Sequence, residues 1–180
     1  MSATQIKTPH WRHGLIEALV LFAVLLGVHL YQTRDAIDGR APPLAGVGLH
    51  GEALSLEALR GKAVLVQFWA TWCPVCRVQE DSIQTLSEDW PVLSIALEDT
   101  PPETLRAYMN KAGLSFPVLR DIDGTLAARF GVRGTPTAFI VDPAGQIRFT
   151  EVGYTTGWGL RLRLWWAATI GSSPAAEPAR

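Results

Sequence analysis

The sequence has few cysteines and no excess of charge of either sign. It contains only 2 cysteines, Cys73 and Cys76, among 180 residues, which excludes a small secreted scaffold held together by many disulfides. The 16 lysines and arginines balance 17 aspartates and glutamates, so the net charge of -1 gives no reason to expect a nucleic-acid partner. The chain is 48% hydrophobic and only 18% charged, which excludes intrinsic disorder and favours one folded domain.

The chain also lacks the residues of a zinc site. Its 4 histidines all lie at or before His50, so the later chain offers no histidine as a base or a ligand. A structural zinc ion takes four ligands, and the cysteine pair supplies two. We therefore expect no metal and no organic cofactor, although two thiolates are able to bind a Cu(I) ion.

Residues 46–51 read Gly-Val-Gly-Leu-His-Gly and match the glycine pattern of a dinucleotide-binding loop. Such a loop lies between a strand and a helix, with an acidic residue about 20 positions further on. Here a proline-containing segment precedes the glycines, and the residue twenty positions after Gly51 is Thr71. We interpret the glycines as turns that lead into the folded domain.

One apolar run, residues 15–31, predicts a membrane-spanning helix. Its 17 residues are the lower limit for crossing a hydrocarbon layer of about 30 Å, and Glu17 is its only acidic residue. A nearly uninterrupted apolar run has no polar face, which disfavours an amphipathic helix of the core, and no small-residue cleavage site follows it, which disfavours a signal peptide. Lys7 and Arg12 precede the run and favour a cytoplasmic N-terminus for residues 1–14.

The remaining chain divides into a polar linker at 32–45, one domain at 46–170, and a tail at 171–180 that we expect to be disordered. Within the domain, short apolar runs predict strands, and longer periodic stretches predict helices. The expected strands are 63–69, 92–97, 137–141 and 147–152, and the expected helices are 74–87, 102–111, 124–130 and 158–170. This order predicts an α/β sandwich around a mixed sheet.

The cysteine pair lies where a predicted strand leads into a predicted helix, in the segment FWATWCPVCR at 68–77. Proline is favourable at the first helical position, so Pro74 places Cys73 at the helix N-cap. The unpaired amides and the dipole of a helix N-terminus lower the pKa of a thiol there. We therefore expect Cys73 to be the exposed, attacking thiol and Cys76, one turn further on, to be the shielded, resolving thiol.

Other uses of two cysteines fit the sequence less well. A haem attachment site needs a histidine directly after the second cysteine, and this chain has Arg77 there. A purely structural disulfide across so short a loop adds little stability. The pattern favours a redox-active dithiol.

The motif FWATWCPVC, followed later by Gly134-Thr135-Pro136-Thr137, resembles the thioredoxin superfamily. Together with the apolar run, it is most similar to the TlpA/ResA-like membrane-anchored thiol–disulfide oxidoreductases, in particular to their suppressor-for-copper-sensitivity D (ScsD) branch. The resemblance covers about residues 44–170. It implies a thioredoxin-like three-layer sandwich with an N-terminal transmembrane helix.

The resemblance also implies roles for single residues. Cys73 and Cys76 match the catalytic pair, and Pro136 matches a cis-proline that packs opposite the dithiol. The backbone of Thr135 would then lie beside Cys73, where an extended substrate adds as a strand. Around the dithiol, three further residues complete the expected substrate-binding surface: Trp72, Pro74 and Val75.

One position departs from the thioredoxin pattern. Gln67 stands where thioredoxin has a buried aspartate that accepts a proton, and glutamine does not titrate. The resemblance assigns an active-site glutamate to Glu98, which we expect to accept the proton of Cys76. A solvated loop acid is the alternative for Glu98.

These observations predict a single-pass inner-membrane protein, a monomer with its catalytic domain in the periplasm. We expect it to exchange disulfides with protein substrates in the direction that reduces the substrate. A membrane electron donor would then re-reduce the protein. Two alternatives remain, a Cu(I)-handling dithiol protein and a peroxidase of the peroxiredoxin type.

Overall fold

The structure is a computed structural model that describes residues 15–17, 19–24, 27 and 39–170. The chain divides into two units, Met1–Arg34 and Asp35–Arg180. In the first unit the described residues are helical, and their large apolar side chains are exposed. None of the described helices is both long enough and apolar enough to cross a membrane. The anchor expected at 15–31 lies partly outside the described residues, and the segments 1–14 and 171–180 lie wholly outside them.

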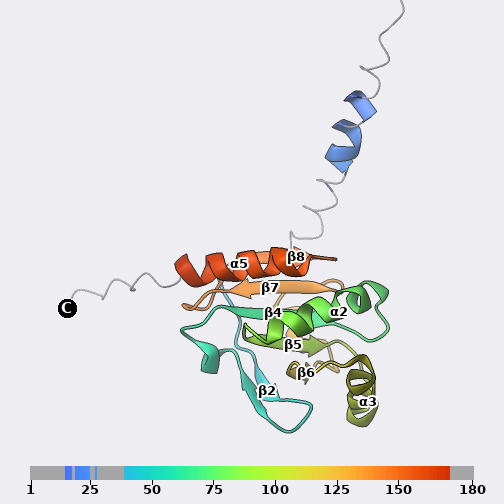
Figure 1. The fold of residues 1–180 in the computed structure, drawn as a ribbon, viewed down its shortest axis with the longest axis vertical. Helices are drawn as coiled ribbons and strands as arrows, with labels where there is room; N and C mark the ends of the chain where they lie inside the picture. Colours follow the sequence, from blue (N-terminus) through green and yellow to red (C-terminus); the bar gives the residue numbers. More distant parts are fainter. Residues whose placement is uncertain (1–14, 18, 25–26, 28–38, 171–180) are drawn as a thin grey trace, which may run out of the picture. The chain divides into compact units, whose positions relative to one another are not determined.

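The second unit is built on a six-stranded mixed sheet (Figure 1). The strands follow the order β1-β8-β7-β4-β5-β6, and β4, β5 and β6 are parallel to one another. Antiparallel pairing joins β4 to β7, β7 to β8 and β8 to β1. Their bounds are β1 (Gly39–Arg40), β4 (Val64–Trp69), β5 (Val92–Ala96), β6 (Val118–Arg120), β7 (Thr137–Val141) and β8 (Gln146–Val152).

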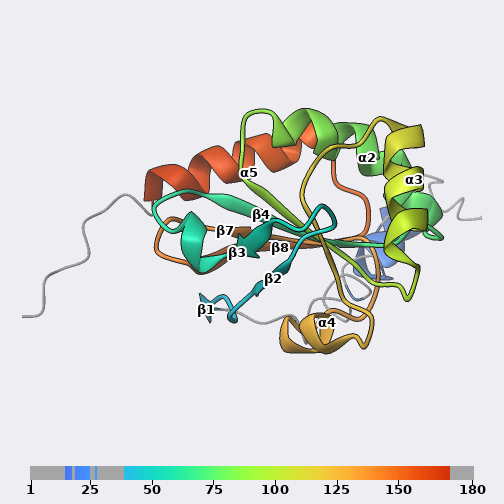
Figure 2. The same cartoon turned by 90° about the horizontal axis from the view of Figure 1, so that it is seen from below.

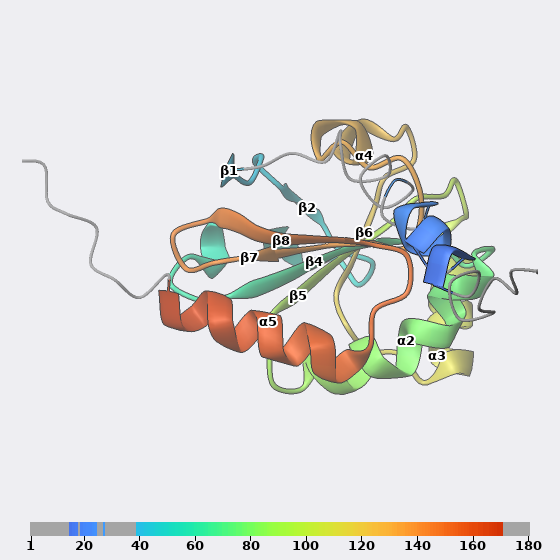
Figure 3. The same ribbon diagram turned by 90° about the horizontal axis from the view of Figure 1, so that it is seen from above.

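Helices cover both faces of the sheet (Figures 2 and 3). One face carries the long helices α2 (Pro74–Ser87), α3 (Pro102–Ala112) and α5 (Gly157–Ile170). The other face carries α4 (Thr125–Arg129) and a hairpin of β2 (Ala45–Val47) and β3 (Ala53–Ser55), which is followed by the short 3-10 helix η1 (Glu57–Leu59). The predicted α/β class with a mixed sheet is confirmed.

Strand β4 shows why the sheet separates two cores. All six of its residues are buried, and alternate side chains point to opposite faces. Leu65 and Trp69 join the cluster under α2, α3 and α5, whereas Val66 and Phe68 join the cluster under α4 and the hairpin. By the same alternation Gln67 faces α2, the helix that begins after Cys73.

The folded unit begins earlier than the expected boundary at residue 46. Within the linker expected at 32–45, Gly39–Arg40 pair with β8, and Leu44 is only 2% exposed. A strand of two residues is too short to show a hydrophobic period, which is why the sequence did not reveal it. The glycine-rich residues that follow form the turn of the β2–β3 hairpin, where Gly51 has a φ of +87°. After this turn the chain passes directly into β3, so the glycines are not followed by the helix that a dinucleotide-binding loop requires.

Candidate functional site

The two cysteines form a disulfide at the N-terminus of α2, with their Cα atoms 5.3 Å apart. Cys73 is the N-cap in an extended conformation, and Pro74 occupies the first helical position as predicted. The backbone N–H of Cys76 donates a hydrogen bond to Cys73 Sγ over 3.2 Å. The helix start therefore supplies a hydrogen-bond donor to the very sulfur that would carry the negative charge of a thiolate.

The expected exposure of Cys73 is wrong. Both cysteines are only 3% exposed, and both belong to the core cluster under α2. The N-cap conformation turns the sulfur of Cys73 back toward its own helix, away from solvent. Trp72 and Val75 on either side are 66% and 42% exposed, and Pro74 is exposed as well. The accessible surface at the dithiol thus belongs mainly to its neighbours.

The Thr135–Pro136 peptide is cis, as the resemblance implies, and it lies against the disulfide. The carbonyl oxygen of Thr135 is 3.6 Å from Cys73 Sγ, although the two residues are 62 positions apart. Pro136 is buried directly before β7, and its own carbonyl accepts a hydrogen bond from Gly153 N–H at 2.8 Å. The end of β8 therefore holds this loop in place beside the first turn of α2.

Glu98 follows β5 and is half-buried. Its carboxylate accepts hydrogen bonds from the N–H and the hydroxyl of Thr71, at 3.0 and 2.8 Å, and from the hydroxyl of Thr100 at 2.7 Å. These contacts fix the turn between β4 and the dithiol. They give Glu98 a positioning task at the site, whereas the role of proton acceptor for Cys76 stays a prediction.

A second carboxylate lies beneath the dithiol and was missed in the sequence. Glu80 is buried at 9% exposure and lines a pocket of about 10 Å³ together with Cys76, Gln67, Trp69, Ile83 and Phe116. The hydroxyl of Tyr108 donates a hydrogen bond to Glu80 Oε1 at 2.6 Å. The four-residue spacing of Cys76 and Glu80 on the predicted helix was the available signal, because it places both residues on one helix face.

Burial is the largest cause of the pKa shifts of Glu80 and Tyr108. Burial raises the pKa of Glu80 above its ordinary value, while the hydrogen bond from Tyr108 and the charge of Arg77 lower it in part. Burial, and then the hydrogen bond to Glu80, raise the pKa of the Tyr108 phenol. The phenol therefore stays protonated and acts as a donor to Glu80.

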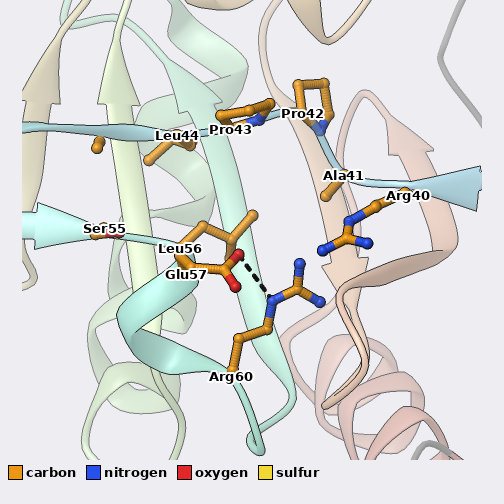
Figure 4. Close-up of a pocket in the computed structure, with 10 residues that line it drawn as sticks. Arg40, Ala41, Pro42, Pro43, Leu44, Ser55, Leu56, Glu57 and Arg60 are labelled. Carbon is orange, nitrogen blue, oxygen red and sulfur yellow. Dashed lines mark hydrogen bonds and ion pairs between the residues drawn. The ribbon is translucent and has the colours of Figure 1, made fainter. Parts of the chain in front are cut away.

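A larger pocket lies away from the dithiol. It has a volume of about 460 Å³ and lies between the β1–β2 segment and η1 (Figure 4). Leu44 and Leu56 in its wall belong to the core cluster on the other face of the sheet from Cys73 and Cys76. An ion pair of 3.0 Å between Arg60 and Glu57 lies across its wall (Figure 4). None of the predicted site residues lines this pocket.

The sequence of residues 37–150 matches the AhpC/TSA family. The chain belongs to the AhpC/TSA family. Among curated relatives of this AhpC/TSA-family protein, "Thioredoxin-like protein YneN" of Bacillus subtilis is 32% identical over 158 residues, which cover 81% of this chain and 91% of the relative. "Thiol:disulfide interchange protein DsbE" of Tatumella citrea is 32% identical over 153 residues, which cover 75% of this chain and 82% of the relative.

Solved structures agree with these relatives. A thiol:disulfide interchange protein of the thioredoxin family from Chlorobium tepidum is 28% identical and superposes with a TM-score of 0.65, covering 74% of this chain and 98% of that one. The thioredoxin-like fold expected from the motifs is confirmed. This AhpC/TSA-family protein is a thiol–disulfide oxidoreductase whose CxxC pair is Cys73 and Cys76.

Proposed function

We propose that this AhpC/TSA-family protein reduces disulfides of protein substrates from a membrane-anchored position in the periplasm. One observation carries the chemistry. The disulfide at the start of α2 lies 3.6 Å from the carbonyl of Thr135, so a thiolate at Cys73 would have a helix amide on one side and a peptide-docking backbone on the other.

The exchange proceeds in two displacements. The thiolate of Cys73 attacks one sulfur of the substrate disulfide, so that a mixed disulfide forms and the other substrate sulfur leaves as a thiolate, which takes up a proton. Cys76 then loses its proton and attacks Cys73 Sγ. The bond between Cys73 and Cys76 forms, the bond to the substrate breaks, and the substrate leaves with two electrons.

Substrates would bind over the exposed residues that surround the buried dithiol. Trp72, Pro74 and Val75 offer apolar surface on one side of Cys73, and the half-buried Thr135 offers its backbone on the other. An extended segment that pairs with this backbone would bring its own sulfur toward Cys73. Pro136 is buried and would shape this surface from beneath.

The proposed anchor is the apolar run at 15–31, whose described part is helical with exposed apolar side chains. Such side chains are stable on a single helix when lipid surrounds them. The catalytic domain would then work in the periplasm as a monomer, and a membrane electron donor would return two electrons to the Cys73–Cys76 disulfide. Membership in the ScsD branch stays a prediction.

Turnover by the purified full chain in detergent tests this function. With a dithiol donor, the wild-type chain should accelerate reduction of a protein disulfide such as that of insulin, and Cys73→Ala should lose the acceleration. Equal rates with the wild-type chain and Cys73→Ala would overturn the proposal. Tight binding of one Cu(I) ion without any acceleration would favour the copper-handling alternative.

A further inference from the structure

The second displacement needs a group that takes the proton of Cys76. Gln67, which faces this region from β4, has no titratable group. The carboxylate of Glu98 is already engaged by Thr71 and Thr100. We infer that Glu80 accepts the proton of Cys76 through one water molecule in the pocket that they share, an inference that rests on the exchange proposed above.

The helix places the two residues on one face. Cys76 and Glu80 are four residues apart within α2, so their side chains stack along the same side of the helix. That side is the buried one, since Cys76 is 3% and Glu80 9% exposed. A proton leaving Cys76 inward therefore meets Glu80 before it meets solvent.

The shared pocket has the size and the polarity for one bound water. Its volume of about 10 Å³ is close to the minimum that a single water molecule needs. Glu80, Cys76 and Gln67 all line it, and they supply three polar partners. Among the described residues Gln67 Oε1 is buried without a hydrogen-bond partner, and a water here would satisfy it. The remaining lining residues are apolar or aromatic and would keep bulk solvent out: Trp69, Ile83 and Phe116.

The charges around Glu80 suit a proton acceptor. Tyr108 faces it from α3, and Arg77 and Asp81 act on it from α2 itself. Burial raises the pKa of Glu80 above its ordinary value, which brings it nearer to the pKa of a thiol and improves proton transfer. The hydrogen bond from Tyr108 stabilises the carboxylate and limits that rise.

The proton balance is then complete. As Cys76 Sγ attacks Cys73 Sγ, its proton passes to the water and a proton of the water passes to Glu80. The substrate sulfur leaves with the electron pair of the broken bond. Glu80 later releases the proton to solvent, so that each turnover returns a carboxylate.

Rapid-quench kinetics of the full-length protein test the inference, because they separate formation of the mixed disulfide from its resolution by Cys76. The variants are Glu80→Gln, which cannot accept a proton, and Tyr108→Phe, which keeps Glu80 but removes its donor. Glu88→Gln is the control, since Glu88 is an exposed acid at the end of the same helix. Each variant is measured from pH 4.5 to pH 8.5.

We expect Glu80→Gln to slow resolution by about 10-fold or more, with formation of the mixed disulfide unchanged. Wild-type resolution should fall as the pH drops through the pKa of Glu80, and this inflection should vanish in Glu80→Gln. In Tyr108→Phe the inflection should move to higher pH, because loss of the hydrogen bond raises the pKa of Glu80. A merely structural role would not shift an inflection in this way.

Two results would overturn the inference. One is an unchanged inflection in Glu80→Gln, and the other is an unchanged inflection in Tyr108→Phe if Glu80→Gln does not fold. If neither the wild-type chain nor any variant formed a mixed disulfide, that result would instead contradict the proposed exchange itself. The two failures are therefore distinguishable.

Discussion

The backbone N–H of Cys76 donates a hydrogen bond to the sulfur of Cys73, 3.2 Å away. The contact joins the two ends of the CxxC motif across the first turn of α2. It places one sulfur at the positive end of the helix and leaves the other within the helix body. The two thiols of the reduced protein should therefore differ in acidity.

Alkylation of the reduced protein tests this difference. Because the helix N-terminus lowers the pKa of Cys73, iodoacetamide at pH 6 to 7 should modify Cys73 about 10-fold faster than Cys76. Peptide mapping after short reaction times measures both rates. The single-cysteine variants Cys76→Ala and Cys73→Ala are the controls for accessibility. Faster modification of Cys76 would reverse the assignment of the two roles.

Replacement of Glu98 by glutamine distinguishes the role of Glu98 from the role of Glu80. Glu98→Gln keeps one acceptor oxygen and loses the charge that Thr71 and Thr100 contact, so the free energy of unfolding should fall by about 2 kcal/mol. Denaturant unfolding measures this loss. The acid inflection of mixed-disulfide resolution should persist in the variant. Its disappearance would make Glu98 the proton acceptor after all.

The raised pKa of Glu80 makes stability depend on pH. Burial raises its pKa in the folded chain above the value in the unfolded chain, so the folded protein binds more protons between the two values. This contribution to stability is complete below the unfolded pKa and is lost as the pH rises through the folded pKa. Relative to the wild-type chain, Glu80→Gln should gain free energy of unfolding at neutral pH, and the gain should shrink toward pH 4.

Chemical unfolding of both proteins between pH 4 and pH 8 measures that difference. Glu88→Gln accounts for the loss of a surface carboxylate on the same helix. If the difference in free energy of unfolding between Glu80→Gln and the wild-type chain does not change with pH, Glu80 is not buried as a charged group.

The orientation of the proposed anchor is tested by reporter fusions after Ala45. Since Lys7 and Arg12 precede the apolar run, an alkaline phosphatase fused there should be active, because it needs export to fold. A fusion that replaces Leu21 and Val24 by arginine should lose this activity, since charges at the centre of a span oppose insertion. Activity of a cytoplasmic reporter at Ala45 would reverse the orientation.

Much of the fold was predictable from strong local signals. Helix α2 begins at Pro74 and ends at Ser87 as expected, because a proline at the first helical position and a long periodic face act together. Strand β7 also has its expected bounds, 137–141. Strands of two or three residues were not predictable, since Gly39–Arg40 and Val118–Arg120 are too short to show alternation.

The motif of the candidate site was predictable from the sequence, but the burial of its residues was not. The CxxC residues and the proline at 136 follow from local patterns, whereas Cys73 is buried in a core cluster and contacts Thr135, which is 62 positions away. Glu80 was missed because its significance rests on a pocket that Gln67, Trp69 and Phe116 close from other elements. The spacing of Cys76 and Glu80 indicates that they share one face of the helix. Only the packed structure shows the pocket that they line.

Trapping of the mixed disulfide tests the central claim most directly. Full-length Cys76→Ala, incubated with a disulfide-containing protein substrate, should accumulate a covalent adduct that a reductant removes. Mass spectrometry should map the adduct to Cys73, because the attacking thiol is intact and the resolving thiol is gone. No adduct in Cys76→Ala, together with one at Cys76 in Cys73→Ala, would contradict the account.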